Sequence, residues 1–149
     1  MKHWGCVALL LVGATGGAAA DGKTVFDNNC AVCHQAGGVG VPGQFPRLAG
    51  RAGTIAAKPQ GKAFLPQVVL NGMGGRITVD GEEILGAMPA LDSLSDDDIA
   101  AVLTYITGLE HKPVTYTAAD IKKARAMPRR GPGAMVALHK SLAAKKVVP

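Results

Sequence analysis

The clearest helical periodicity in this chain lies between residues 95 and 106. Its apolar positions recur three or four residues apart and form one face: Ile99, Val102, Leu103 and Ile106. Ser95 precedes three aspartates, and with Asp98 it has the pattern of a capping box at the positive end of a helix. Gly108 marks the end of the segment. The pattern predicts an amphipathic helix that packs one face on a core.

Two earlier segments also show helical spacing. Residues 21–33 predict a first helix, with Val25 and Phe26 facing inward. Residues 62–70 predict a second helix, which ends at a glycine. Pro66 lies inside this segment and lacks the N–H that a helix interior needs. We therefore expect it either to delay the start of the helix or to kink it.

The remaining segments have other patterns. Residues 37–53 are rich in glycine and proline and predict a loop wrapped around something, rather than an element of its own. Residues 76–85 alternate around Asp80-Gly81, which predicts a short hairpin. Near the C-terminus, residues 117–127 and 134–146 predict two helices without strong amphipathic character.

The length of 149 residues fits one domain with an extension. Residues 1–20 have the pattern of a signal peptide: a short polar start, an apolar middle that contains Cys6, and small residues before Asp21, where we expect cleavage. The apolar run over residues 5–20 is 16 residues long, a little short of the ~20 that span a bilayer. We therefore favour secretion over an uncleaved anchor, and expect no membrane association after cleavage.

Charge divides the chain into two parts. Residues 21–110 hold six Lys or Arg against ten Asp or Glu, a net charge of −4. Residues 111–149 hold nine Lys or Arg against one acid, a net charge of +8. An acidic body with a basic tail indicates either a charged partner or a tail that folds back on its own domain.

Cys30, Cys33 and His34 form the pattern C-x-x-C-H, which is typical of covalent haem attachment. Residues three apart lie on one face of a helical turn, so both thiols can reach the vinyl groups of one porphyrin. The adjacent histidine can then offer a ring nitrogen to the iron. A redox dithiol and half of a zinc site are the alternatives, and the histidine and the lack of any later cysteine count against both. We predict one covalent haem c.

A six-coordinate haem needs a second donor opposite His34. The thioethers and imidazoles after residue 20 that qualify are Met73, Met88, Met127, Met135, His111 and His139. A proline follows Met88, and its fixed φ helps to hold the sulfur at one distance from the iron. We predict Met88 as the ligand and Met73 as the runner-up. His111 and His139 lie in or beside the polar tail, and we expect both at the solvated surface.

Taken in order, these motifs resemble those of the class I cytochromes c, specifically the exported single-haem bacterial type. The resemblance covers residues 22–108 and rests on Gly22-x-x-Val25-Phe26, Cys30 to His34, Pro46-Arg47-Leu48, Val69-Leu70-Asn71-Gly72, Gly86-Ala87-Met88-Pro89-Ala90 and the segment from Leu94 to Ile106. It implies an all-α fold around one haem c, with a hairpin-like insert beside the haem propionates. We accordingly expect a haem domain over residues 21–110 and a basic extension over residues 111–149.

The resemblance also implies roles for single residues. The two cysteines would form the thioether bonds, and His34 and Met88 would be the axial ligands. The carbonyl of Pro46 would accept the Nδ1 proton of His34, which fixes the ring. Arg76 is a possible contact of a propionate. The first and last helices of this fold cross, and their contact residues would be Gly22, Phe26 and Tyr105.

These expectations describe an electron carrier rather than an enzyme. With both axial positions filled, the iron has no site for a substrate, and the chain shows no other catalytic constellation. We expect a periplasmic one-electron carrier, as acceptor or subunit of a dehydrogenase, whose redox partners are that dehydrogenase, a terminal oxidase or another cytochrome. Without Met88 as ligand, an open iron could bind or reduce oxygen or peroxide. With free cysteines, the chain would be a thiol oxidoreductase.

The extension of 39 residues exceeds the minimal fold of the family. It is similar to extensions of cytochrome subunits that are paired with periplasmic sulfite- or alcohol-oxidising dehydrogenases. Its basic residues are expected either to dock on an acidic partner, or to stay solvated or pack on the acidic body. The residues in question are Lys122, Lys123, Arg125, Arg129 and Arg130. Nucleic acid is not an expected partner in an exported compartment.

Overall fold

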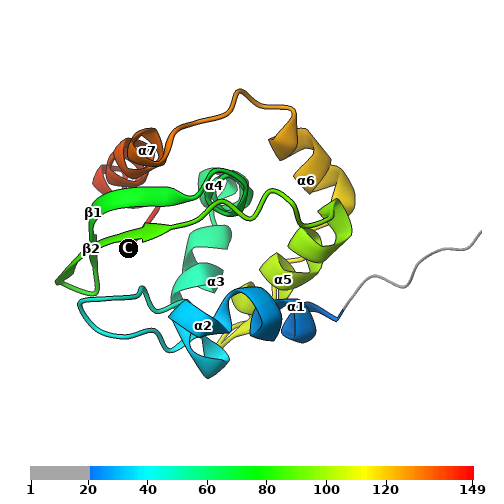
Figure 1. Ribbon diagram of the computed structural model, residues 1–149, viewed down its shortest axis with the longest axis horizontal. Coiled ribbons are helices and arrows are strands. Elements are labelled where there is room, and N and C mark those ends of the chain that lie inside the picture. The colour runs from blue at the N-terminus through cyan, green and yellow to red at the C-terminus, as the bar shows by residue number, and fades with distance from the viewer. Residues whose placement is uncertain (1–20) are drawn as a thin grey trace, which may run out of the picture.

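The computed structural model describes residues 21–149, so the expected signal peptide lies outside the described residues. The elements in chain order are α1 (Gly22–Asn29), α2 (Ala31–His34), the 3-10 turn η1 (Ala36–Gly38), α3 (Arg51–Ala56), α4 (Pro59–Asn71), β1 (Met73–Val79), β2 (Glu82–Met88), α5 (Asp96–Gly108), α6 (Ala118–Arg125) and α7 (Pro132–Ala144). The hairpin lies at one edge of the molecule, next to α7 and on the side opposite to α5 and α6 (Figure 1). This mostly helical architecture with one hairpin confirms the predicted fold class. None of the described helices is long and apolar enough to cross a membrane.

Helices α1 and α5 cross at a close contact. A Cβ added to Gly22 would lie 2.3 Å from the carbonyl oxygen of Ala101, so only glycine allows this approach. One turn further along, the rings of Phe26 and Tyr105 pack with their centroids 5.5 Å apart. Helix α5 begins where the sequence predicts, with the Ser95 side chain accepting a hydrogen bond from the third helical N–H. The expected crossing and its contact residues are therefore confirmed.

Two of the predicted helices have different bounds. The segment expected to be one helix over residues 21–33 is divided at Cys30, whose φ of −114° departs from helical geometry. Helix α4 begins at Pro59, three residues before the predicted start, because proline is well suited to the first helical turn. It then continues past Pro66 to Asn71. The expectation of a late start is thus wrong.

The loop predicted over residues 37–53 is present but shorter. It contains the turn η1 and an isolated bridge between Val41 and Phe45, and it ends where α3 begins at Arg51. The hairpin is longer than predicted, running from Met73 to Met88. Its two-residue turn is Asp80-Gly81, with φ of 53° and 84°. Positive φ at both positions is what a tight hairpin turn requires.

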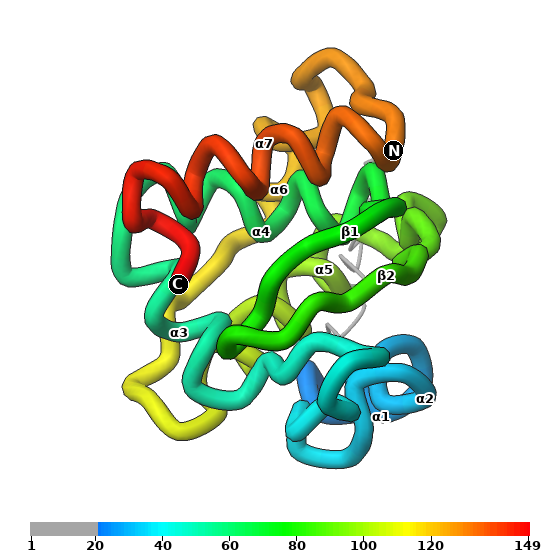
Figure 2. Tube along the Cα trace, turned by 90° about the vertical axis from the view of Figure 1, so that its left-hand side faces the viewer, coloured from blue at the N-terminus to red at the C-terminus, as the bar shows by residue number. Residues whose placement is uncertain are grey.

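The C-terminal extension packs on the body of the protein. Helix α6 lies against α4 and α5, and α7 lies along β1 and α4. Figure 2 shows α7 on the side of the hairpin opposite to α1 and α2. Arg125 pairs with Asp96 at 2.9 Å, and Arg129 pairs with Asp92 at 3.0 Å. Of the alternatives considered for the basic tail, these ion pairs match the one in which it packs on its own acidic body.

The extension also contributes to the hydrophobic core. The largest fully buried apolar side chains are Phe26, Leu70, Ile99, Leu103, Ile121, Met135 and Val148. The last three come from the extension, and they belong to the same cluster as the others. Burying a side chain of this size contributes roughly 1.5–3 kcal/mol. The extension is therefore held by apolar packing as well as by ion pairs.

Candidate haem site

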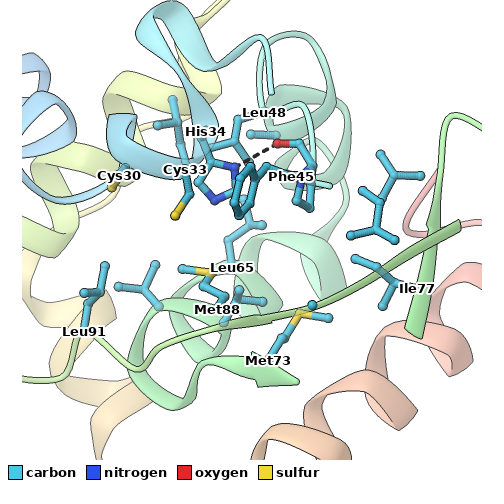
Figure 3. A pocket seen from close by; sticks show the side chains of 18 of the residues that line it. Cys30, Cys33, His34, Phe45, Leu48, Leu65, Met73, Ile77, Met88 and Leu91 are labelled. Carbon is cyan, nitrogen blue, oxygen red and sulfur yellow. Dashed lines mark hydrogen bonds between the residues drawn. The ribbon is translucent and has the colours of Figure 1, made fainter. Parts of the chain in front are cut away.

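An apolar pocket opens between α2, the hairpin and α4, and Figure 3 shows it from close by. Its volume is about 230 Å³, far more than the ~10–15 Å³ that a single water needs. Helices α4 and α5 supply an aliphatic and aromatic lining that consists of Phe64, Leu65, Val68, Val69, Val102, Leu103 and Ile106. None of the described residues that line the pocket is Asp or Glu. The pocket therefore suits a large, flat, mainly apolar group.

Cys30 lies between α1 and α2, and Cys33 lies within α2. Cys30 and Cys33 both line the pocket as free thiols, and Figure 3 shows them on the same wall as His34. Burial raises the pKa of the Cys30 thiol to about 11. A neutral thiol is a poor nucleophile in disulfide exchange, so burial does not activate Cys30 for that chemistry.

His34 is held in one orientation by the loop that follows it. Its Nδ1 donates a hydrogen bond to the carbonyl oxygen of Pro46 at 2.8 Å, shown as the dashed line in Figure 3. Burial lowers the pKa of His34, although the bond to Pro46 opposes this. With Nδ1 engaged by Pro46, Nε2 is the nitrogen left to bind a metal.

The loop between His34 and Pro46 closes tightly on itself. The amide of Gly40 donates to the carbonyl of His34 at 2.9 Å. Gly40 has a φ of 69°, and a Cβ there would lie 2.6 Å from the carbonyl oxygen of Phe45. This glycine lets the chain turn back so that Pro46 reaches the histidine.

Met88 and Met73 lie across the pocket from His34, as Figure 3 shows. They are directly opposite each other at the open end of the hairpin, and both line the pocket. Gly72 supports this end, because its φ is 68° and a Cβ would lie 2.5 Å from the carbonyl oxygen of Met88. The structure thus brings both candidate thioethers to the wall that faces the imidazole. Met88 is the last residue of β2 rather than part of a loop.

Two buried basic residues of the pocket were not predicted. Arg51 on α3 and His139 on α7 are each only 6% exposed, and both line the pocket. The expectation that His139 lies at the surface is wrong, whereas His111 is exposed as expected. A signal for His139 exists, because Met135 and Leu142 lie four residues before and three after it on one apolar face of α7. Arg51 carries no comparable signal.

Arg76 lies away from the pocket lining. Its guanidinium forms an ion pair with Glu83 at 2.6 Å across the hairpin, and its side chain is 55% exposed. Arg47 and Arg51 are the arginines that line the pocket. The contact of Arg76 with a propionate therefore stays a prediction, and the structure offers Arg51 as a better-placed candidate.

A helical fold around an apolar pocket, with C-x-x-C-H on one wall, defines a c-type haem protein. Consistent with this, a family model described as Cytochrome c matches residues 19–110, and the chain belongs to the cytochrome c family. It is therefore an electron-transfer protein, and its cysteine motif implies covalently bound haem c.

Individual relatives support the assignment. The chain is 41% identical over 126 residues to cytochrome c-552 of Thermus thermophilus, covering 80% of this chain and 84% of that protein. It is 36% identical over 121 residues to the cytochrome c subunit of a quinone alcohol dehydrogenase of Gluconobacter oxydans, covering 79% of this chain but 24% of that protein. It is 36% identical over 103 residues to the chloroplastic cytochrome c6 of Chlamydomonas reinhardtii, covering 66% of this chain and 61% of that protein.

Proposed function

We propose that this cytochrome carries one electron at a time through a haem c bound to Cys30 and Cys33, with His34 and Met88 as axial ligands. The observation that carries the proposal is that His34 and Met88 enter one apolar pocket from opposite walls (Figure 3). When bound, the haem supplies reversible one-electron exchange at its iron.

The residues of the chain position the ligands and exclude water. The bond from His34 to Pro46 fixes the imidazole and strengthens it as a donor. The pairing of the two strands fixes the backbone position of Met88 at the end of β2. A rigid, apolar surround keeps the ligand geometry similar in both oxidation states, and a thioether ligand favours the reduced state.

The axial ligands are tested on the purified protein. We expect a peptide containing residues 30–33 to carry the mass of haem, and the ferric spectrum to show a methionine-sulfur charge-transfer band. Cyanide should bind slowly, because it must displace a ligand. A haem-loaded protein that lacks the band and binds cyanide at once would instead have an open axial site, as in a protein that binds oxygen or peroxide. A peptide without added mass would favour thiol chemistry.

We also propose that the protein is exported to the periplasm and exchanges electrons there with a dehydrogenase, a terminal oxidase or another cytochrome. The signal-like pattern of residues 1–20 supports export. The name of the Gluconobacter relative, a cytochrome subunit of a dehydrogenase, supports such a partner. The mass of the mature protein tests export, because cleavage before Asp21 leaves a chain of residues 21–149 plus one haem.

Exposed lysines of α6 are the candidate docking residues. Arg125 and Arg129 pair with the body of the protein, whereas Lys122 and Lys123 are exposed. Steering by these charges predicts that K122E/K123E slows electron transfer with the partner at low salt but not at high salt. K145E is the control, because Lys145 follows α7, which Figure 1 shows on the opposite side of the molecule from α6. Equal rates for both variants would exclude docking through α6.

A further inference from the structure

Two buried basic side chains in the haem pocket have unmet hydrogen-bonding capacity. In the described part of the chain, Nη1 and Nη2 of Arg51 and Nδ1 of His139 are buried and have no hydrogen-bond partner. Both residues are more than nine-tenths buried, and both line the pocket. An unsatisfied buried polar group costs about 1–3 kcal/mol, and more when it is charged. Such groups in one pocket indicate a ligand that accepts hydrogen bonds.

Arg51 has no carboxylate within hydrogen-bond distance among the described residues. The nearest carboxylate is that of Asp80, 3.9 Å from Nη1 and beyond hydrogen-bond distance. Asp80 is also engaged by Arg47, which donates to it from Nε at 3.0 Å. Burial lowers the pKa of Arg51, which shows the penalty on its charge. This end of the pocket is therefore electropositive and short of anionic acceptors.

His139 shares this electropositive environment. Burial, together with the nearby charges of Arg51 and Lys140, lowers its pKa to about 4. A neutral His139 can donate one hydrogen bond from Nδ1, and Arg51 can donate two from its planar fork. This combination matches a carboxylate, which accepts several hydrogen bonds and carries the missing negative charge.

We propose that Arg51 and His139 together bind one propionate carboxylate of the haem, so that α7 of the extension forms part of the haem site. The inference rests on the haem c that the family assignment implies. The thiols of Cys30 and Cys33 use the vinyl groups, which leaves the propionates as the charged groups of the porphyrin. Helix α7 is already in position, because Val136, one turn before His139, packs 3.5 Å from where a Cβ of Gly75 on β1 would lie. The carboxylate would join the extension to the cofactor.

The test compares four variants of the full-length holoprotein: R51Q, H139F, R51K and R76Q. We expect R51Q and H139F to move the NMR resonances of one propionate, to raise the pH at which that propionate protonates, and to lower the hydrogen-exchange protection of α7 about 10-fold or more. R51K retains the charge and should lie between R51Q and the wild type. R76Q tests the other arginine predicted for this contact, and it should leave all three readouts unchanged if Arg51 and His139 hold the propionate.

The outcomes separate this inference from the proposed function. All variants should keep the haem mass and the methionine charge-transfer band, because neither residue is an axial ligand. Wild-type propionate resonances and α7 protection in both R51Q and H139F would overturn the propionate site while leaving electron transfer intact. A propionate shift in R76Q alone would assign the contact to Arg76 instead.

Discussion

The hydroxyl of Tyr116 donates a hydrogen bond to the carbonyl oxygen of Lys62 at 3.1 Å. That carbonyl would normally accept the N–H of residue 66 within α4, but residue 66 is a proline and has no N–H. A residue of the C-terminal extension thus satisfies a backbone group that the proline leaves open, 54 residues earlier in the chain. Tyr116 is buried, and burial raises its pKa well above the usual value, so its hydroxyl stays protonated.

Removing this hydroxyl should destabilise the protein only while Pro66 is present. We expect Y116F to lower the free energy of unfolding by about 1 kcal/mol, because it leaves the partly buried Lys62 carbonyl without this donor. In P66A the helix regains its own N–H, so adding Y116F should change stability little. Unfolding by guanidinium, followed by circular dichroism for the four proteins, measures this coupling. An equal loss in both backgrounds would show that the hydroxyl does not compensate for the proline.

This pair also shows why the fold was only partly predictable from sequence. Helix α5 and the turn at Asp80-Gly81 follow from residues close together in the chain, and the structure confirms both. The carbonyl that Pro66 leaves open within α4 is instead satisfied by Tyr116, which lies far from Pro66 in sequence. Local patterns do not show which distant residue will supply a missing donor. The sequence alone therefore left open whether the extension packs on its own domain, stays solvated or docks on a partner.

The crossing of α1 and α5 gives a second prediction. G22A places a Cβ 2.3 Å from the Ala101 carbonyl oxygen and 2.9 Å from the Tyr105 Cβ. Backbone atoms cannot move aside easily, so the helices must separate, and we expect a loss of about 1–3 kcal/mol. G133A in α7 is the control, because a Cβ there meets nothing within 4 Å. It should be neutral or stabilise by up to about 1 kcal/mol. Thermal unfolding of G22A and G133A measures the difference in stability. Similar melting temperatures for the two variants would contradict a tight crossing of α1 and α5.

The paired thioethers of the hairpin give a third prediction. Because Met73 and Met88 face each other across the strands and both line the pocket, Met73 can partly replace Met88. We expect M73L to keep the methionine charge-transfer band of the ferric protein. M88L should weaken that band and lower the reduction potential, and M73L/M88L should abolish it. Loss of the band in M73L alone would show instead that Met73 is the ligand.

The site was predictable where its chemistry is local and not where it depends on packing. Cys30, Cys33 and His34 are adjacent in sequence, and the structure places all three on the pocket wall. Arg51 and His139 are 88 residues apart in sequence and lie on different helices. Only the folded chain shows that both are buried in the same pocket. Arg76 was predicted from its position in the insert; the hairpin pairs it with Glu83 at the surface, and its contact with a propionate stays a prediction.

A fourth prediction concerns the attachment of the extension. Arg125 donates to the Asp96 carboxylate at 2.9 Å and to the carbonyls of Asp92 and Leu94 at 2.9 and 3.0 Å. R125A removes all three bonds, and we expect a loss of about 1–3 kcal/mol together with faster proteolysis within residues 111–149. K122A, on the same helix but exposed, is the control and should digest at the wild-type rate. Equal digestion of both variants would show that apolar packing alone retains the extension.

The start of α6 gives a pH-dependent prediction. The Asp120 carboxylate accepts hydrogen bonds from the amide and hydroxyl of Thr117, at 3.0 and 2.9 Å, and these bonds lower its pKa. Because the folded pKa lies below the unfolded value of about 3.8, the unfolded chain binds the proton more readily. The stabilisation is therefore complete above that value and is lost as the pH falls through the folded pKa.

We expect D120N to be less stable than the wild type by about 0.5–1 kcal/mol near pH 6, in the range of a helix cap. The difference should shrink toward zero below about pH 3, where the wild-type carboxylate is also neutral. T117S keeps the hydroxyl and should retain the wild-type pH dependence, whereas T117A should lose part of it. Urea unfolding curves of the four proteins at both pH values provide the measurement. A D120N deficit that stays constant with pH would mean that the amide changes the cap through its shape rather than its charge.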